Sequence, residues 1–231
     1  MPDLPEQFDP RKSAQTGLDV LSHGLPALPD VLTYEMSVPV AFWTATTCAV
    51  VLFLRYSKRP DEEPTPIAIM GAFYREDDRW RAHKYWGGGG FSYDPIARPG
   101  GSRDLDGRAL VISGGGFTDQ PKPGHAAAIE TGRVSPAVAA IAVVQDGEKD
   151  RRPLQSHFGA WVVCLERWSP YQIHALDAAG TVLATTEGPP GLPSRHRRSR
   201  RRRPSRAGPP TGSARTTASG ALSRRAGSAT R

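Results

Sequence analysis

Short apolar runs, each closed by a turn signal, are the feature that most restricts how this chain can fold. The 231 residues include 24 glycines and 22 prolines, which interrupt helices. Short, regularly spaced strands without long helical patterns between them predict an all-β fold, an antiparallel β-sandwich or open barrel. The predicted strands are Thr46–Tyr56, Ile67–Tyr74, Arg79–Trp86, Arg108–Ser113, Val138–Gln145, Gly159–Arg167, Tyr171–Leu176 and Thr181–Thr186.

Turn residues support three of these strand boundaries. Glu76-Asp77-Asp78 predicts a hairpin turn, and Asp146-Gly147 is a pair suited to positive φ. Asp177-Ala-Ala-Gly180 separates the last two predicted strands and offers a glycine for the left-handed position. The turns therefore predict antiparallel hairpins.

Composition divides the chain into three parts. Residues 1–35 form a Pro-rich arm, which we expect to be loose apart from one short helix capped by Ser13 and ended by Gly24. Residues 36–187 carry the strand patterns and form the predicted globular domain. Residues 188–231 hold no acid and no aromatic residue, and this composition predicts a disordered basic tail.

The net charge of +7 is unevenly distributed. Twelve of the 30 basic residues are arginines of the tail, so residues 1–187 keep 18 basic and 23 acidic residues, a net charge of −5. The composition of the tail fits two origins. It can be a native basic tail, or it can be the translation of a GC-rich gene in the wrong reading frame. If native, the tail can contact phosphates without reading sequence, through Arg197, Arg198, Arg200, Arg201, Arg202 and Arg203.

The segment Met36–Leu54 carries no charge, and its length approaches that of a membrane span. Its proline and threonines argue against a span, and Ala49–Leu54 is better interpreted as a strand buried on both faces. No secretory signal is visible at the first residues, so we expect a cytoplasmic protein. Cys48 and Cys164 can then be two buried thiols or, if their strands are neighbours, a disulfide.

Two glycine runs are the main candidates for a ligand site. Neither run has the lysine of a phosphate loop or the spacing of a dinucleotide fingerprint. Arg81-Ala82 and Arg108-Ala109 each precede a glycine run by four residues, so two similar loops could face each other across a ligand. The candidate ligand residues are His83, Trp86, Gly88, Gly89, Tyr93, Ser113 and Gly115. The competing interpretation is a strand that runs into a flexible loop.

Chemistry-bearing motifs are otherwise scarce. The six histidines lack helical i, i+4 spacing and have no neighbouring ligands at zinc intervals, so we expect no metal and no cofactor. Acyl-transfer motifs are also missing from the sequence. A hydrolase site would have to be assembled from His83, Asp94 and Ser113, without a recognised motif.

Several short segments of the sequence resemble the C-terminal part of conserved, uncharacterised actinobacterial proteins. They are the run from Gly159 to Arg167, the run from Ala175 to Leu183, SGGGF at 113–117 and the lead-in at 132–136. The resemblance covers roughly 70–187 and excludes the tail. It implies a β-rich cytoplasmic body and no particular activity.

Together these patterns predict a non-enzymatic binding or regulatory module that takes a small ligand or a protein partner. Non-specific nucleic-acid binding through the tail is the first alternative, and the hydrolase around His83 is the second. No membrane partner is expected.

Overall fold

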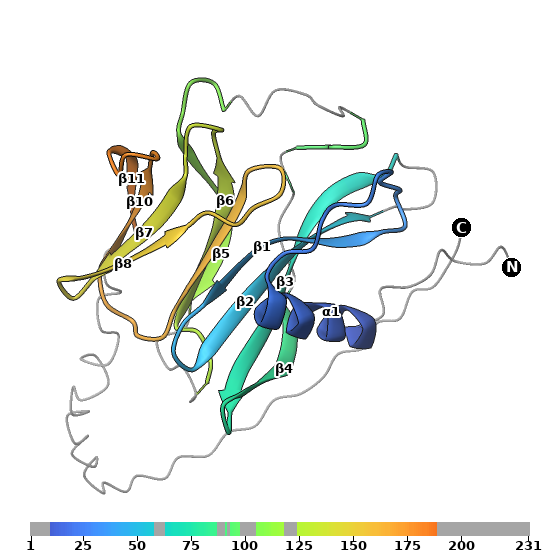
Figure 1. The fold of residues 1–231 in the computed structure, drawn as a ribbon, viewed down its shortest axis with the longest axis horizontal. Helices are drawn as coiled ribbons and strands as arrows, with labels where there is room; N and C mark the ends of the chain where they lie inside the picture. The colour runs from blue at the N-terminus through green and yellow to red at the C-terminus, as the bar shows by residue number, and fades with distance from the viewer. Residues whose placement is uncertain are drawn as a thin grey trace, which may run out of the picture. The chain divides into compact units, whose positions relative to one another are not determined.

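A computed structural model describes residues 10–57, 63–86, 91, 93–97, 105–117 and 124–188, with the backbone alone for 10, 84–86 and 117. All of these residues belong to one compact unit, Met1–Leu192. They form antiparallel sheets that do not close into a barrel, together with one helix (Figure 1). The predicted all-β, sandwich-type fold is therefore confirmed. The arginine-rich tail lies outside the described residues.

Three sheets make up the fold. The first has the strand order β1-β2-β3-β4, the second β11-β10-β7-β8 and the third β5-β6-β9. The strands are β1 (Ser37–Thr44), β2 (Cys48–Ser57), β3 (Thr65–Glu76), β4 (Arg79–Trp86), β5 (Leu110–Phe117), β6 (Ala128–Val134), β7 (Ala140–Gln145), β8 (Glu148–Pro153), β9 (Ala160–Leu165), β10 (Tyr171–Leu176) and β11 (Val182–Glu187).

Strand β2 is buried on both of its faces. Its residues alternate between two apolar clusters: Ala49, Val51 and Phe53 contact one, while Val50 and Leu52 contact the other. Alternation is the consequence of the two-residue side-chain period of a strand. The uncharged segment Met36–Leu54 thus forms β1 and most of β2. Among the described residues, no helix is long and apolar enough to cross a membrane.

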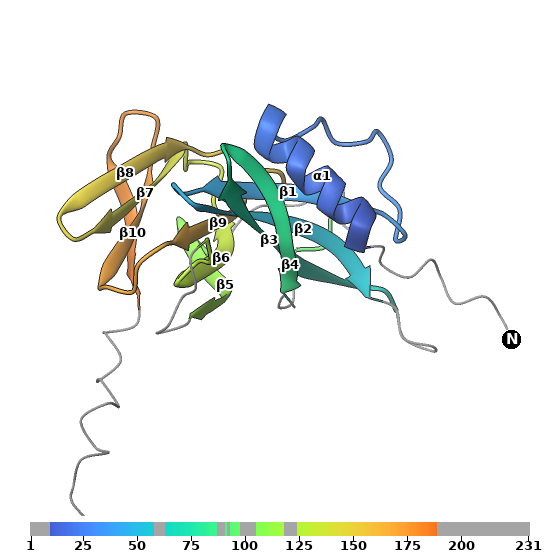
Figure 2. The ribbon, with the colours of Figure 1, turned by 90° about the horizontal axis from the view of Figure 1, so that it is seen from below.

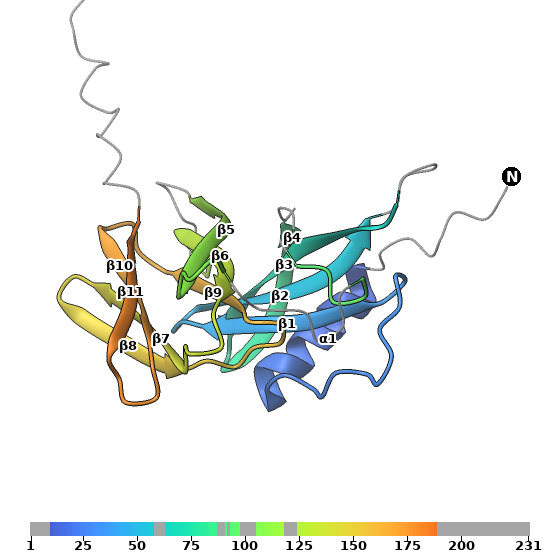
Figure 3. The same ribbon diagram turned by 90° about the horizontal axis from the view of Figure 1, so that it is seen from above.

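Helix α1 (Pro10–His23) covers one face of the first sheet, and the third sheet lies toward the other face (Figures 2 and 3). Val20 is buried in the cluster with Phe53 and Phe73, so the helix of the arm packs against the first sheet. The amide of Gly24 donates to the Val20 carbonyl at 2.8 Å with φ of +84°, which confirms Gly24 as the end of the helix. Ser13 lies inside the helix and does not cap it.

The second and third sheets share the main apolar cluster with the first. Trp161 of β9, Ile173 of β10 and Leu52 of β2 are all members, and each is almost fully buried. Both residues of the Asp146-Gly147 turn have positive φ, 53° and 82°, as the sequence predicted for a tight hairpin. That hairpin places the polar strand β8 at a sheet edge, beside β7.

Candidate functional site

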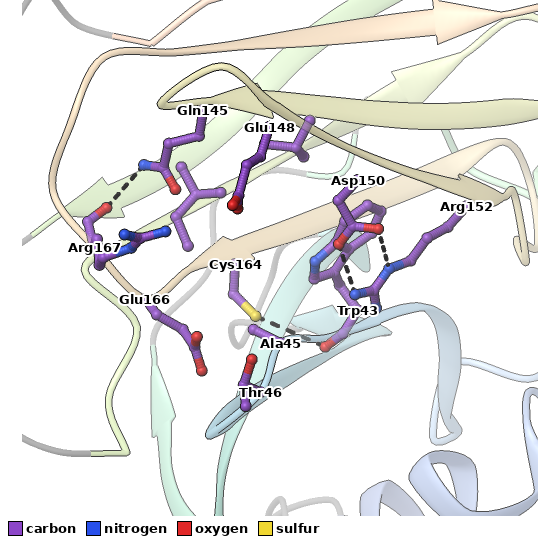
Figure 4. Close-up of a pocket in the computed structure, with 12 residues that line it drawn as sticks. Trp43, Ala45, Thr46, Gln145, Glu148, Asp150, Arg152, Cys164, Glu166 and Arg167 are labelled. Atoms are coloured by element: carbon purple, nitrogen blue, oxygen red, sulfur yellow. Dashed lines mark hydrogen bonds and ion pairs between the residues drawn. The ribbon is translucent and has the colours of Figure 1, made fainter.

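A pocket of about 190 Å³ opens where β8 comes near the ends of β1 and β9 (Figure 4). We call it the β8 pocket. Its wall consists of side chains from four strands and the turns that follow them. They are Trp43, Ala45, Thr46, Val143, Gln145, Glu148, Asp150, Arg152, Cys164, Leu165, Glu166 and Arg167.

One face of the β7–β8 hairpin supplies the polar wall. Glu148, Asp150 and Arg152 alternate along β8, so their side chains point to the same side. On β7, Gln145 is the register partner of Glu148, and Val143 is the partner of Asp150. Cross-strand partners share a face, so five neighbouring side chains line the pocket together.

Arg152 has several contacts within this wall. Its guanidinium donates to both Asp150 oxygens, at 3.0 and 2.7 Å, and to the Thr44 hydroxyl at 2.8 Å and the Thr44 carbonyl. The guanidinium carbon also lies 4.4 Å from the centre of the Trp43 ring, a cation–π distance. Asp150 therefore neutralises Arg152, and the pair ties β8 to the end of β1.

Two carboxylates at the pocket have no such cation. Glu166 accepts hydrogen bonds through Oε1 from the Thr47 hydroxyl, at 2.8 Å, and from the Thr47 amide. Among the described residues neither Glu166 nor Glu148 forms an ion pair. The remaining arginine, Arg167, faces Asp146 at 3.8 Å. The pocket thus carries negative charge that its own arginines do not offset.

The Gln145 amide has a fixed orientation beside these carboxylates. Its Nε2 donates to the Arg167 carbonyl at 3.0 Å and to the Ser169 carbonyl at 3.4 Å. Because the amide nitrogen faces the turn after β9, the amide oxygen faces the pocket, as Figure 4 shows. Gln145 therefore adds a neutral hydrogen-bond acceptor to the two acids.

The Cys164 thiol forms part of the buried wall. Cys164 is 1% exposed, and its sulfur lies 3.9 Å from the Cys48 sulfur and 3.8 Å from the Trp43 carbonyl oxygen. The thiol–thiol hydrogen bond with Cys48 and burial raise the pKa of the Cys164 thiol well above its usual range, and the charges of Cys48 and Glu166 act in the same direction. The charge of Arg152 opposes them. Cys164 is therefore a neutral thiol at neutral pH.

The residues predicted from the glycine runs lie elsewhere. Gly88 and Gly89 fall outside the described residues, and Trp86 is described only by its backbone, which pairs with Met70. His83 is exposed on β4, with its Nε2 atom 3.1 Å from Nδ1 of His125. A ligand site between the two glycine-rich loops therefore stays a prediction.

Tyr93 and the residues of the hydrolase hypothesis have other contacts. Tyr93 is buried at 8% exposure, with its ring 4.8 Å from the Arg133 guanidinium carbon. The Asp94 carboxylate accepts from the Tyr56 hydroxyl at 2.7 Å and from two backbone amides that follow it. Ser113 is exposed on β5, in a different sheet from His83, and the described hydrogen bonds join none of the three.

Because Gly115 has no side chain, the carboxylate of Glu130 on the neighbouring strand β6 can occupy that space. A Cβ at this position would lie 2.6 Å from Glu130 Oε2. The other oxygen of Glu130 accepts a hydrogen bond from the Tyr171 hydroxyl at 2.7 Å, which links β6 to β10. Burial raises the pKa of Glu130, although the bond from Tyr171 acts to lower it. Tyr171 also has a raised pKa, because of burial and its bond to Glu130.

The raised pKa of Glu130 predicts a pH-dependent stability. The folded state binds this proton more tightly than the unfolded state, so the contribution is complete below about pH 4.3, the ordinary pKa of glutamate, and is lost as pH rises through the folded pKa. Glu130→Gln keeps an acceptor for Tyr171 and removes the titration. In urea unfolding from pH 4 to 7, we expect the stability difference, wild type minus variant, to fall with rising pH. A difference independent of pH would contradict the assignment.

Comparison of the chain with protein-family models, with curated proteins and with solved structures found no match. The resemblance to uncharacterised actinobacterial proteins therefore stays a prediction. The β8 pocket was not predicted, because β8 is a run of charged residues with no apolar alternation. The Asp146-Gly147 turn was the available signal, since a tight hairpin requires a partner strand immediately after it.

Proposed function

We propose that the protein is a non-enzymatic binding module that takes a small organic cation in the β8 pocket. One observation carries the proposal: Glu148 and Glu166 face the pocket without a cationic partner among the described residues, while the guanidinium of Arg152 is already held by Asp150. A positively charged ligand would supply the missing partner. Charge-assisted hydrogen bonds are about twice as strong as neutral ones.

The size of the pocket limits the ligand. A cavity of about 150 Å³ accommodates benzene, so about 190 Å³ suits a molecule of that size or slightly larger. Pockets for drug-sized ligands are larger, at about 300 Å³ or more. Trp43 and Val143 supply an apolar surface beside the acceptors, which favours an amine with a compact hydrocarbon part.

Three probes of nearly equal shape test the charge preference. Benzylamine is a cation, benzyl alcohol is neutral and benzoate is an anion. We expect isothermal titration calorimetry of the protein to detect benzylamine binding and to detect much weaker binding of the other two. Equal affinity for benzoate, or no binding of benzylamine, would contradict the proposal.

Removal of either carboxylate charge should weaken the binding of benzylamine. We expect Glu148→Gln and Glu166→Gln each to raise the Kd about tenfold, because one charge-assisted hydrogen bond contributes about 1.5 kcal/mol. Glu35→Gln is the matched control, since Glu35 is an exposed carboxylate away from the pocket. A similar loss in Glu35→Gln would indicate general electrostatic attraction and not a site.

Nucleic-acid binding is a second candidate, supported by seven arginines between Arg195 and Arg203. The charges of this run are adjacent in sequence, and no aromatic residue accompanies them. Such a segment favours phosphate contacts without base stacking. The salt dependence of DNA binding tests this candidate.

A further inference from the structure

The two cysteines of the chain meet between two sheets. Cys48 begins β2 in the first sheet, and Cys164 lies near the end of β9 in the third. Both are 1% exposed free thiols, and their sulfurs are 3.9 Å apart. A disulfide bond is about 2.0 Å long, so the sulfurs need to approach by about 2 Å. Residues 48 and 164 are 116 positions apart in the sequence, and folding alone brings their side chains into contact.

Only one of the two thiols lines the β8 pocket. Cys164 is part of the pocket wall, and Cys48 is not among the lining residues. Figure 4 shows the Cys164 sulfur beside Trp43, Ala45 and Thr46. A small reagent in the pocket therefore meets Cys164 first, and Cys48 lies behind it as the second thiol. This asymmetry places a cysteine that can react with peroxide in front of a second cysteine that can resolve it.

We propose that Cys48 and Cys164 are a redox pair that a hydroperoxide entering the β8 pocket converts to a reversible disulfide. The Cys164 sulfur attacks the terminal peroxide oxygen, the O–O bond breaks, and Cys164 becomes a sulfenic acid while an alcohol or water leaves. The Cys48 sulfur then attacks the Cys164 sulfur and expels the oxygen as water. Two thiol protons and two electrons pass to the peroxide, and a dithiol reductant later restores the two thiols by thiol–disulfide exchange.

The surroundings of Cys164 set the pH dependence of this oxidation. The thiolate is the attacking species, and the thiol–thiol hydrogen bond with Cys48 together with burial disfavours it. The oxidation is therefore slow at neutral pH and accelerates as pH rises toward the thiol pKa. The pair responds to sustained peroxide and not to a brief pulse.

The disulfide would connect the first sheet to the third. It closes a loop of more than 100 residues, and the entropy removed from the unfolded chain predicts an increase in Tm of about 10 °C. Because the bond forms at the wall of the β8 pocket, it also fixes β9 against the start of β2. The proposal is independent of which ligand the pocket takes.

Intact mass spectrometry of the full chain tests the pair. The protein is incubated with hydrogen peroxide at pH 7 and pH 9, denatured and treated with N-ethylmaleimide. We expect a monomer that has lost two hydrogens and takes up no maleimide, forming faster at pH 9, with two maleimides added after reduction. Two maleimides without reduction, or a covalent dimer on a non-reducing gel, would overturn the proposal.

Single-cysteine variants test the order of the two thiols. In Cys48→Ala, the sulfenic acid of Cys164 lacks its resolving thiol and should be trapped by dimedone. In Cys164→Ala, Cys48 should give at least tenfold less dimedone adduct, because it does not line the pocket. Equal trapping in both variants would overturn the assignment of Cys164 as the thiol that reacts with the peroxide. The wild-type mass measurement remains decisive if a variant does not fold.

Discussion

Replacement of Gly132 by alanine is expected to lower the free energy of unfolding by about 3 kcal/mol or more. Gly132 lies in β6, the central strand of the third sheet, between Ile112 of β5 and Trp161 of β9. A Cβ there would be 1.9 Å from the Val111 carbonyl oxygen and 2.8 Å from the indole nitrogen of Trp161. Backbone cannot move aside as a flexible side chain can, so the strands must separate.

The same contact contains a hydrogen bond that the substitution would disturb. Trp161 donates from its indole nitrogen to the Val111 carbonyl at 3.3 Å, and Trp161 is among the largest fully buried side chains. Displacement of β5 therefore affects the main apolar cluster as well as the strand pairing. This coupling is the reason to expect a large effect from one methyl group.

Gly116→Ala is the matched control for Gly132→Ala. Gly116 lies in the neighbouring strand β5, and a Cβ at that position meets nothing within 4 Å. We expect a change within about 0.5 kcal/mol. Urea unfolding followed by tryptophan fluorescence measures both variants. Equal destabilisation would show that loss of glycine itself, and not the contact with Val111, is responsible.

Removal of the arginine tail is expected to abolish the binding of duplex DNA. Each phosphate contact releases counterions, so log K falls with log salt at about −0.9 per contact. Seven arginines between Arg195 and Arg203 predict a slope of about −6 if all make contact, a loss of several thousandfold between 50 and 200 mM salt. The remainder of the chain up to Glu187 has a net charge of −5 and should repel DNA.

A salt titration of the full chain and of residues 1–187 measures this effect. Fluorescence anisotropy with a labelled duplex gives the affinity at each salt concentration. A full chain whose binding does not change with salt, or a truncated chain that still binds, would contradict a role of the tail as an electrostatic anchor. A variant with glutamine at Arg200, Arg201, Arg202 and Arg203 should have an intermediate slope, near half of the full value.

The strands that were predicted correctly share strong local signals. Val138–Gln145 and Tyr171–Leu176 are apolar and adjoin turns that contain glycine, so propensity and turn chemistry agree. Strand β6 was missed because Glu130, Thr131 and Gly132 interrupt its apolar character. Its central position between β5 and β9 depends on Gly132, and no local pattern distinguishes a glycine in a strand from a glycine in a loop.

The β8 pocket was beyond prediction for a different reason. Its residues come from three separated segments, 43–46, 143–152 and 164–167, which adjoin only after the sheets have assembled. Glu148 and Glu166 resemble ordinary solvated acids in the sequence. Their lack of a cationic partner among the described side chains becomes visible only when Arg152 is seen bound to Asp150.

By itself the sequence determined the fold class, the hairpin turns, the end of the helix and the separation of an acidic body from a basic tail. These properties depend on side-chain periodicity, glycine conformation and charge, which act over a few residues. Only the tertiary structure decided that α1 covers β2, that Cys48 meets Cys164, and that β8 completes a pocket with β1 and β9. Such contacts join separate elements of the chain, up to 116 positions apart for the two cysteines, and they arise from the burial of several sheet faces at once.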